Sequence, residues 1–473
     1  MKQEDRTAAN KEPSVPAAIA RFFDAHPSPK KGDDWPSLTR EDDGSLTVRL
    51  ALSPGARSYI RVEIRLPAAE QYNGVLLGVG IGGLGGYIPT ELLCHHAAQG
   101  YAAAASDLGT SAGAAAGYQN PDMWDDFGWR ANHEMTLAAK QAARIVYGRD
   151  PSFCYFLGAS TGGQQAMSLA QRFPRDYNGI VAGVPAHSRV ALHTYFIWNY
   201  HQLHAKDGKP LFSDEEIDAI HNAAVDFMQA RGDGEPGDRI VSRPSTDRRV
   251  VTRLVDDIAR RLPLTDTQRE KLLAVYDGPR DPVTGRRIYA GIPAGAEKTA
   301  FSFHDMIHGD VDPLRYTFVW LYGPGYDVDD FDYHAGYARM RRVLTPHLDA
   351  DDPDLSAFDA AGGRLLIYAG AADALVPFHS SHKYLARVRA AIGRRRADRC
   401  VRYFLLPGKD HNVGGDGVNR WRAYRAGGRR VPDGDELDVI RRWVEEGQAP
   451  DALLGLHVTP EGETTLRRPV PHD

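Results

Sequence analysis

The chain has 473 residues, of which 42% are apolar and 25% are charged, and its formal net charge is −5. A chain without a basic excess is not expected to bind nucleic acid or an anionic membrane surface, and no apolar run approaches the roughly 20 residues that cross a bilayer. Because the length exceeds what one hydrophobic core usually supports, we expect one large domain with an insertion or a second domain.

The amino terminus and the cysteines predict a cytoplasmic protein. Residues 1–14 are polar and are predicted to be mobile, and they contain no apolar segment of the kind found in secretory signals. Cys94, Cys154 and Cys400 form no Cys-x-x-Cys pair and are too few for a disulfide framework.

Strands and helices alternate along most of the chain. Apolar runs that end in glycine or a polar residue predict buried parallel strands, and apolar residues at helical spacing predict the helices between them. This alternation is typical of a parallel sheet covered by helices on both faces, an α/β fold. The strands are expected within 72–80, 100–109, 152–160, 178–186, 362–373 and 399–411, and the helices within 125–148, from about 379, and within 435–447.

Residues 187–345 interrupt the alternation. This stretch is helix-rich, with aromatic clusters and loops of proline, glycine and aspartate. Because the sheet pattern returns afterwards, we predict a core formed by 15–186 and 346–473 with a lid domain inserted at 187–345. Such a lid would cover a site at the carboxyl ends of the strands, where ligands bind in open α/β sheets.

The first glycine-rich stretch, GVGIGGLGG, leaves two interpretations open. Gly78, Gly80 and Gly83 match G-x-G-x-x-G after a strand, and Asp107 ends the next strand, as in a dinucleotide-binding unit. However, Pro89 and further glycines follow, so the helix that should receive a pyrophosphate starts late. The alternative is a loop whose backbone N–H groups face an oxyanion.

Two serines lie in short glycine motifs, and only one has the surroundings of a nucleophile. A nucleophile elbow needs a strand, a tight turn and then a helix. Ser111, in GTSAG, is followed by Gly117 and Pro121, which exclude a long helix. Ser160, in FLGASTGGQQAM, has all three features, so we predict that Ser160 is the nucleophile.

The order of residues along the chain supports this choice. In an α/β-hydrolase the nucleophile is followed by an acid after a late strand and by a histidine after the last strand. Asp373 follows RLLIYAGAA, and His411 follows VRYFLLPGKD. Asp410 is a poorer candidate for the acid, because its position next to His411 should direct it away from the imidazole ring.

The segment GASTGGQQAMSLAQRFPRDYNGIVAGVPA resembles the nucleophile region of the tannase and feruloyl esterase family. The resemblance continues through DFGWRANHEMT, LTDTQREKLLAVYDGPRDPVTGRRIYAGIPAGAE and DLSAFDAAGGRLLIYAGAADALVP, and it spans most of residues 72–450. It implies an α/β-hydrolase fold with a lid and a Ser–Asp–His triad at Ser160, Asp373 and His411. The implied substrates are carboxylic esters, often of phenolic acids.

The chain departs from the family pattern at its cysteines. The resemblance implies a disulfide between the residue before the nucleophile and the residue after the catalytic histidine, but Ala159 and Asn412 stand there. Pro263 likewise stands where a lid cysteine is expected. The loss of both partners of the first disulfide fits a reducing compartment.

The calcium loop of the family is also altered. The resemblance implies regularly spaced aspartates in the lid, of which QARGDGEPGDRI keeps Asp233 and Asp238 and loses the first. Calcium needs six to eight oxygen ligands, so two interpretations stay open: a calcium site around Asp233 and Asp238, or an acidic loop in solvent. In either case we expect no required cofactor.

These features together predict a serine hydrolase that cleaves a small-molecule ester through an acyl-enzyme. The backbone N–H of Thr161 and one from the Gly82–Gly83 turn are predicted to form the oxyanion hole. An acyltransferase or lactone-forming cyclase with the same acyl-serine is one alternative. An NAD(P)-dependent oxidoreductase is the alternative from another class.

Overall fold

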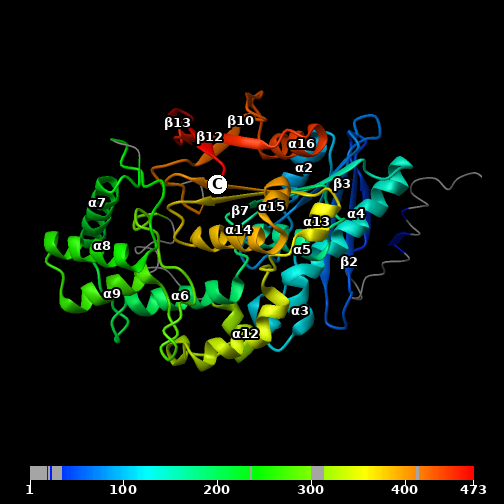
Figure 1. The fold of residues 1–473 in the computed structure, drawn as a ribbon. Helices are drawn as coiled ribbons and strands as arrows, with labels where there is room; N and C mark the ends of the chain where they lie inside the picture. Colours follow the sequence, from blue (N-terminus) through cyan, green and yellow to red (C-terminus); the bar gives the residue numbers. More distant parts are fainter. Residues whose placement is uncertain (1–18, 20–21, 24–34, 235–236, 300–313, 412–414) are drawn as a thin grey trace, which may run out of the picture.

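The computed structural model describes residues 19, 22–23, 35–234, 237–299, 314–411 and 415–473 (Figure 1). The amino-terminal segment 1–14, which was predicted to be mobile, lies outside the described residues.

A nine-stranded sheet forms the centre of the molecule, in the order β1-β2-β3-β5-β4-β6-β7-β8-β9 (Figure 1). Neighbouring strands from β5 to β9 are parallel, whereas β1, β2, β3 and β5 pair antiparallel. The predicted α/β class is therefore confirmed, with an antiparallel edge added. The strands are β1 (Ser37–Arg40), β2 (Leu46–Leu52), β3 (Ile60–Leu66), β4 (Val75–Val79), β5 (Ala102–Ser106), β6 (Phe153–Ala159), β7 (Gly179–Gly183), β8 (Arg364–Gly370) and β9 (Val401–Leu406).

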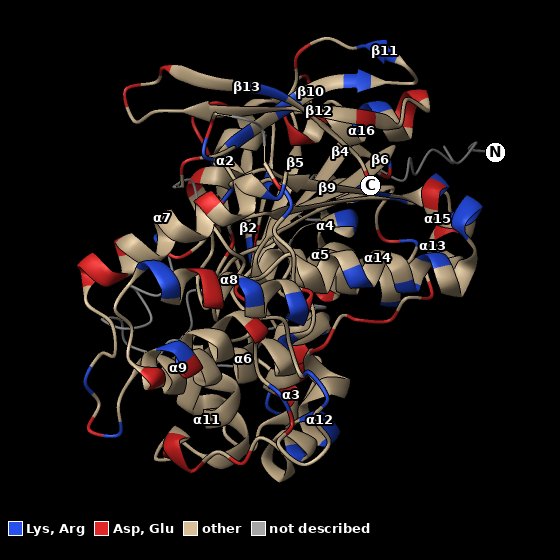
Figure 2. Ribbon diagram, turned by 60° about the vertical axis from the view of Figure 1, so that its left-hand side comes forward, with Lys and Arg blue, Asp and Glu red and all other residues tan. Residues whose placement is uncertain are grey.

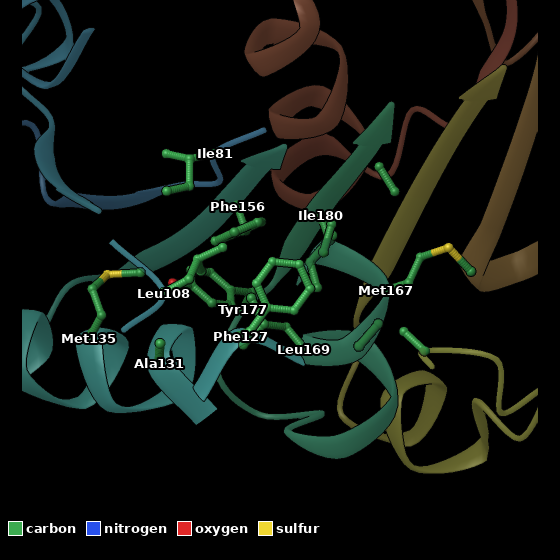
Figure 3. Close-up of a cluster of buried hydrophobic side chains, with 14 of the residues drawn as sticks. Ile81, Leu108, Phe127, Ala131, Met135, Phe156, Met167, Leu169, Tyr177 and Ile180 are labelled. Atoms are coloured by element: carbon green, nitrogen blue, oxygen red, sulfur yellow. The ribbon is translucent and has the colours of Figure 1, made fainter. Parts of the chain in front are cut away.

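Helices cover both faces of the parallel strands, as the continuous apolar runs predicted. Successive side chains of a strand point to opposite faces, so Leu76 and Phe156 lie in the core under α4 and α5, and Leu77 and Tyr155 lie in the core under α2 and α16. Figure 3 shows the first of these cores, where Phe156 and Ile180 lie near Phe127 and Leu169. The helices concerned are α2 (Thr90–Ala98), α4 (Ala131–Tyr147), α5 (Thr161–Arg172) and α16 (Glu436–Glu446), and the first face also carries α13 (Ser356–Ala360), α14 (His379–Ile392) and α15 (Arg394–Cys400).

A block of helices, here called the helical segment, lies between β7 and β8 and projects from the sheet (Figure 1). Much of it has a core of its own, with Ile220, Leu254 and Tyr276 fully or almost fully buried. This helical character agrees with the predicted insertion, whose boundaries at 187 and 345 stay a prediction. Its helices are α6 (Arg189–Leu203), α7 (Asp214–Ala230), α8 (Arg248–Arg261), α9 (Asp266–Asp277), α11 (Tyr316–Tyr322), η4 (Val328–Asp330) and α12 (Ala335–Leu348).

Short helices lead from β5 into α4. They are η1 (Ala114–Gly117), α3 (Pro121–Asp125) and the π-helical turn η2 (Asp126–Arg130), which continues directly into α4. The brevity of η1 agrees with the prediction that no long helix follows Ser111.

A second sheet near the carboxyl terminus was not predicted. Its order is β11-β10-β12-β13, and its strands pair antiparallel. The arginine-rich sequences RWRAYRA and TTLRRPVP lack the continuous apolar runs that predicted the parallel strands. The strands are β10 (Arg420–Ala426), β11 (Arg429–Arg430), β12 (Pro450–Val458) and β13 (Thr464–Pro471).

Within the described ranges, none of the helices combines the length and the apolar character that crossing a bilayer requires.

Candidate active site

The three predicted catalytic residues follow three strands of the parallel set. Ser160 follows β6, Asp373 follows β8 and His411 follows β9. β6 pairs with β7, β7 with β8, and β8 with β9, all in parallel register. Their carboxyl ends therefore form one edge of the sheet, where ligands of open α/β sheets bind.

Ser160 occupies a strained turn between β6 and α5. Its backbone has φ 61° and ψ −119°, a conformation that costs a side-chain-bearing residue about 1–3 kcal/mol. The turn is held on both sides, because the Ser160 N–H donates to the Gly183 carbonyl at 2.9 Å and the Ser160 carbonyl accepts from Ala186 N–H at 3.1 Å. This is the strand–turn–helix geometry of a nucleophile elbow.

Two glycines make this turn possible by removing side chains. A Cβ on Gly158 would lie 2.3 Å from the Gly162 carbonyl oxygen, and a Cβ on Gly80 would lie 2.9 Å from Gly162 Cα. The elbow and the loop after β4 are thus packed backbone against backbone, which positions the amino terminus of α5 next to the glycine-rich loop.

Asp373 and His411 are joined by a hydrogen bond. His411 Nδ1 donates to Asp373 Oδ2 at 2.8 Å, and the Asp373 side chain is fully buried while that of His411 is 6% exposed. The other carboxylate oxygen accepts from the N–H groups of Leu375 at 3.0 Å and Val376 at 2.8 Å. These bonds fix the carboxylate, which in turn orients the imidazole and leaves Nε2 as the nitrogen available for proton transfer.

The predicted oxyanion residues are linked to each other through side chains. The Thr161 hydroxyl donates to the Gly83 carbonyl at 2.7 Å. Gln165 holds the preceding residue of the loop, because its Nε2 donates to the Ile81 carbonyl at 3.0 Å and its Oε1 accepts from Ile81 N–H at 3.3 Å. The glycine-rich loop is therefore fastened to the first turn of α5, and the Gly82–Gly83 turn is held beside Thr161.

Arg189, at the start of α6, extends this network into the helical segment. Its guanidinium donates from Nη2 to the Thr161 hydroxyl at 3.0 Å and from Nε to Gln164 Oε1 at 2.7 Å. The residue is only 4% exposed, and it forms no ion pair with any described carboxylate. Burial lowers the pKa of Arg189, but a guanidinium stays protonated in proteins, so a positive charge lies beside the nucleophile turn.

The glycine motif that matched a dinucleotide site has packing roles here. A Cβ on Gly78 would lie 2.4 Å from the Tyr177 hydroxyl and 2.7 Å from Phe156 Cδ2. Asp107 is fully buried, and its carboxylate accepts from the backbone N–H of Arg61 at 2.9 Å, from Arg61 Nε at 2.8 Å and from Gly109 N–H at 2.9 Å. The carboxylate of Asp107 is thus occupied by hydrogen bonds to Arg61 and Gly109 of the same chain.

The two aspartates considered above as calcium ligands both pair with arginines. Asp233 pairs with Arg231 at 2.9 Å, and Asp238 pairs with Arg468 of β13. Over the part of the chain that the structure describes, no group of three or more histidine, cysteine, aspartate and glutamate side chains is arranged to hold a metal ion.

The cysteines carry free thiols. Cys94 is exposed, whereas Cys154 and Cys400 are buried. Of the two positions that depart from the family disulfide, Ala159 ends β6, and Asn412 lies outside the described residues.

The sequence interpretation did not identify Arg189, Gln164 or Gln165. Their contacts join positions 25 to 84 residues apart in the chain, and a single arginine or glutamine has no local pattern that predicts such a contact. The only local signal was a pair of glutamines in the first turns of the helix after the nucleophile.

Comparison with known proteins shows that most of the chain matches one protein family. The family model described as tannase and feruloyl esterase matches residues 49–470. A probable feruloyl esterase B-2 of Aspergillus fumigatus is 29% identical over 422 residues, which are 86% of this chain and 78% of that protein. A probable feruloyl esterase B-2 of Aspergillus flavus is 30% identical over 447 residues, 89% and 82% of the two chains.

Solved structures share the fold. Feruloyl esterase B from Aspergillus oryzae has a TM-score of 0.77 at 23% identity, covering 90% of this chain and 86% of that one. Tannin acyl hydrolase from Aspergillus niger has a TM-score of 0.70 at 21% identity, covering 92% and 86%. The predicted α/β-hydrolase fold is confirmed.

Proposed function

Because the chain belongs to the tannase and feruloyl esterase family and is a carboxylic ester hydrolase, we propose that it cleaves its ester through an acyl-enzyme on Ser160. The observation that carries this proposal is the hydrogen bond of 2.8 Å between His411 and the buried Asp373, at the edge of the sheet where Ser160 occupies its strained turn. An oriented imidazole and a half-buried serine turn at one edge are the two parts that activation of a hydroxyl requires.

In the proposed mechanism, His411 Nε2 takes the proton of the Ser160 hydroxyl as Ser160 attacks the ester carbonyl. Asp373 remains ionised and stabilises the imidazolium. The proton then passes to the departing alcohol, and the acyl group stays on Ser160. Water, deprotonated by the same imidazole, attacks the acyl carbon and releases the acid.

The developing oxyanion is proposed to accept from the backbone N–H of Thr161 and from one N–H of the Gly82–Gly83 turn. The bond from the Thr161 hydroxyl to the Gly83 carbonyl supports this role, because it fixes the two parts of the hole relative to each other before the substrate arrives. Preorganised donors of this kind are worth roughly 10²–10³ in kcat each.

We propose that the ester carries an aromatic, phenolic-acid type of acyl group. The relatives named as feruloyl esterases suggest this class. Aromatic rings next to the network of Thr161 and Arg189 support it: the guanidinium of Arg189 lies 5.5 Å from the ring centre of Phe127, which contacts Tyr316 edge to face at 5.6 Å. We further propose that the helical segment acts as a lid over the site.

The reaction is proposed to need no cofactor or metal, and the protein is proposed to act in the cytoplasm on a small molecule. The replacement of a family cysteine by Ala159 next to the nucleophile supports a reducing compartment. Fractionation of the source cells, followed by immunodetection, tests the location, and recovery of the protein outside the cytoplasmic fraction would contradict it.

The experiment that tests the function compares wild type with Ser160→Ala on a panel of esters. The panel contains p-nitrophenyl acetate and butyrate, methyl ferulate, methyl gallate and a terephthalate monoester. The proposal predicts turnover by wild type, faster for the aromatic acids than for the alkyl acids, and none above background for Ser160→Ala. Ser111→Ala, which alters the exposed serine of the other motif, is the matched control and should keep wild-type rates.

The same panel distinguishes hydrolysis from acyl transfer. Reactions that include an added alcohol or amine are examined for both the free acid and the transferred acyl product. Free acid as the main product supports the hydrolase, and a transferred product at the expense of the acid would assign the acyl-serine to a transferase.

A further inference from the structure

A cavity of about 690 Å³ opens between the helical segment and α14. Its walls come from residues 286–290, from α12, from residues 349–352 and from the first turns of α14. The described residues that line it do not include Ser160, Asp373 or His411. Its volume falls within the range of small-molecule sites, so it is large enough for a ligand of its own.

The cavity is lined mainly by positive charge. Figure 2 shows basic positions on both α12 and α14, and both helices contribute to the lining of the cavity. Five basic side chains line it against three carboxylates, although the chain as a whole carries a net charge of −5. The basic residues are Arg286, Arg287, Arg341, Lys383 and Arg387, and the acidic residues are Asp349, Asp351 and Asp352.

Two of the three carboxylates already have partners in the protein. Asp351 accepts from His187 Nδ1 at 3.0 Å and pairs with Arg387. Asp349 accepts from the backbone N–H of Val190 at 3.1 Å. These contacts hold the acidic side chains in place and use part of their charge within the protein.

Three of the basic side chains have no such partner. Among the residues that the structure describes, no carboxylate lies within ion-pair distance of Arg286, Arg341 or Lys383. Burial and the nearby charge of Arg287 lower the pKa of Lys383, as expected where positive charges lie together without compensation.

Buried polar atoms of the lining also lack ordinary hydrogen bonds. His379 is 7% exposed, and its ring nitrogens are buried beside the backbone carbonyl of Pro244 without a hydrogen bond of ordinary geometry. Arg287 Nε, also buried, has none either, although its Nη2 pairs with Asp277. An unsatisfied buried donor or acceptor costs about 1–3 kcal/mol, so these atoms add to the uncompensated polarity behind the basic lining.

We propose that this cavity binds a small molecule bearing at least two anionic oxygens, as carboxylate or phosphate groups. Arg286, Arg341 and Lys383 supply both the positive charge and the hydrogen-bond donors. Arginine and lysine form charge-assisted bonds to either kind of anion. The site is separate from ester cleavage, so it adds a binding function to the proposed hydrolase.

Calorimetric titration of the full-length protein with pyrophosphate and, separately, with citrate tests the site. Ionic strength is held constant with NaCl, because screening alone changes the interactions of exposed charges. Saturable binding with one site per chain is expected for at least one probe, and the tighter probe identifies phosphate or carboxylate as the preferred group. Absence of saturable binding of both probes would overturn the proposal.

Substitutions of lining residues test whether the probe binds in this cavity. Arg286→Gln with Lys383→Gln removes two positive charges from the lining and should weaken the bound probe about tenfold or more. Arg395→Gln, an exposed arginine of α15 away from the cavity lining, is the matched control and should bind as wild type does. Equal affinities of wild type and the double variant, or an equal loss in the control, would contradict the site.

Binding is measured without turnover, so the result does not depend on the role of Ser160. The double variant should also hydrolyse the best ester of the panel at the wild-type rate. A loss of binding with full esterase activity supports a separate site, whereas a parallel loss of both would contradict the separation.

Discussion

The Arg189 guanidinium lies 3.0 Å from the hydroxyl of Thr161, the residue that follows the predicted nucleophile. That hydroxyl donates onward to the Gly83 carbonyl at 2.7 Å. A chain of two hydrogen bonds thus connects the helical segment, the first turn of α5 and the glycine-rich loop. The predicted oxyanion hole is therefore held by side chains from outside the elbow.

Thr161→Val should lower activity because it removes the bond to Gly83 while keeping the size of the side chain. We expect kcat to fall about 10–100-fold with a smaller change in KM, since a loosened hole weakens transition-state binding more than substrate binding. Steady-state kinetics on the best ester measure this. Thr161→Ser keeps the hydroxyl and should stay within a few-fold of wild type, and full activity of Thr161→Val would contradict the linkage.

Asp373→Asn should reduce kcat by about 10⁴-fold, because an amide leaves His411 in the wrong tautomer while the shape of the site is kept. The neighbouring buried carboxyl Asp410 provides the matched variant, and Asp410→Asn should retain most of the activity. Steady-state kinetics of the two proteins check the assignment of the acid. The opposite pattern, with Asp410→Asn inactive and Asp373→Asn active, would exchange their roles.

Gly80→Ala and Gly82→Ala should differ although they lie two residues apart in one loop. A Cβ on Gly80 would lie 2.9 Å from both Gln165 Oε1 and Gly162 Cα, whereas a Cβ on Gly82 would meet nothing within 4 Å. We expect Gly80→Ala to lose about 1–3 kcal/mol of unfolding free energy and Gly82→Ala to be close to wild type. Urea denaturation measures both, and equal stabilities would show that the loop is not packed as described.

The stability of the protein should depend on pH through Asp349. Burial raises the pKa of its carboxyl from 3.8 to about 6. In the unfolded chain the group ionises near pH 4, so the contribution of Asp349 to the unfolding free energy is fully present below that pH and is lost as pH rises to about 6. The expected total loss is roughly 2–3 kcal/mol.

Asp349→Asn cannot ionise, so its unfolding free energy should lack this decrease between pH 4 and pH 6. Urea denaturation at several pH values compares it with wild type and with Asp352→Asn, an exposed neighbour whose profile should parallel that of wild type. A decrease of equal size in Asp349→Asn would assign the pH dependence to other groups.

The parts of the fold that could be predicted from sequence are those with a local signal. The strands β4, β6 and β8 are continuous apolar runs, and the turn at Ser160 is marked by Gly158 and Gly162. Each of these signals lies within about ten residues, and the structure has the strands where they were expected.

The parts that could not be predicted depend on contacts between distant residues. Strand β10 alternates exposed arginines with apolar residues, and it is stabilised by pairing with β12, about 30 residues later. Arg189 acquires its position only when the start of α6 meets the first turn of α5, and the proposed anion site requires residues from Ser188 to Arg387 to meet. Neither the composition nor the local spacing of residues predicts these long-range contacts.

The central claim, an acyl group carried by Ser160, is tested most directly by mapping the covalent intermediate. Wild type is mixed with p-nitrophenyl butyrate, quenched with acid during the first turnovers, digested and analysed by mass spectrometry. The account predicts one butyryl group per chain, on the peptide that contains Ser160, and none in Ser160→Ala. A butyryl group on the peptide that contains Ser111, or an undiminished burst of p-nitrophenol from Ser160→Ala, would contradict it.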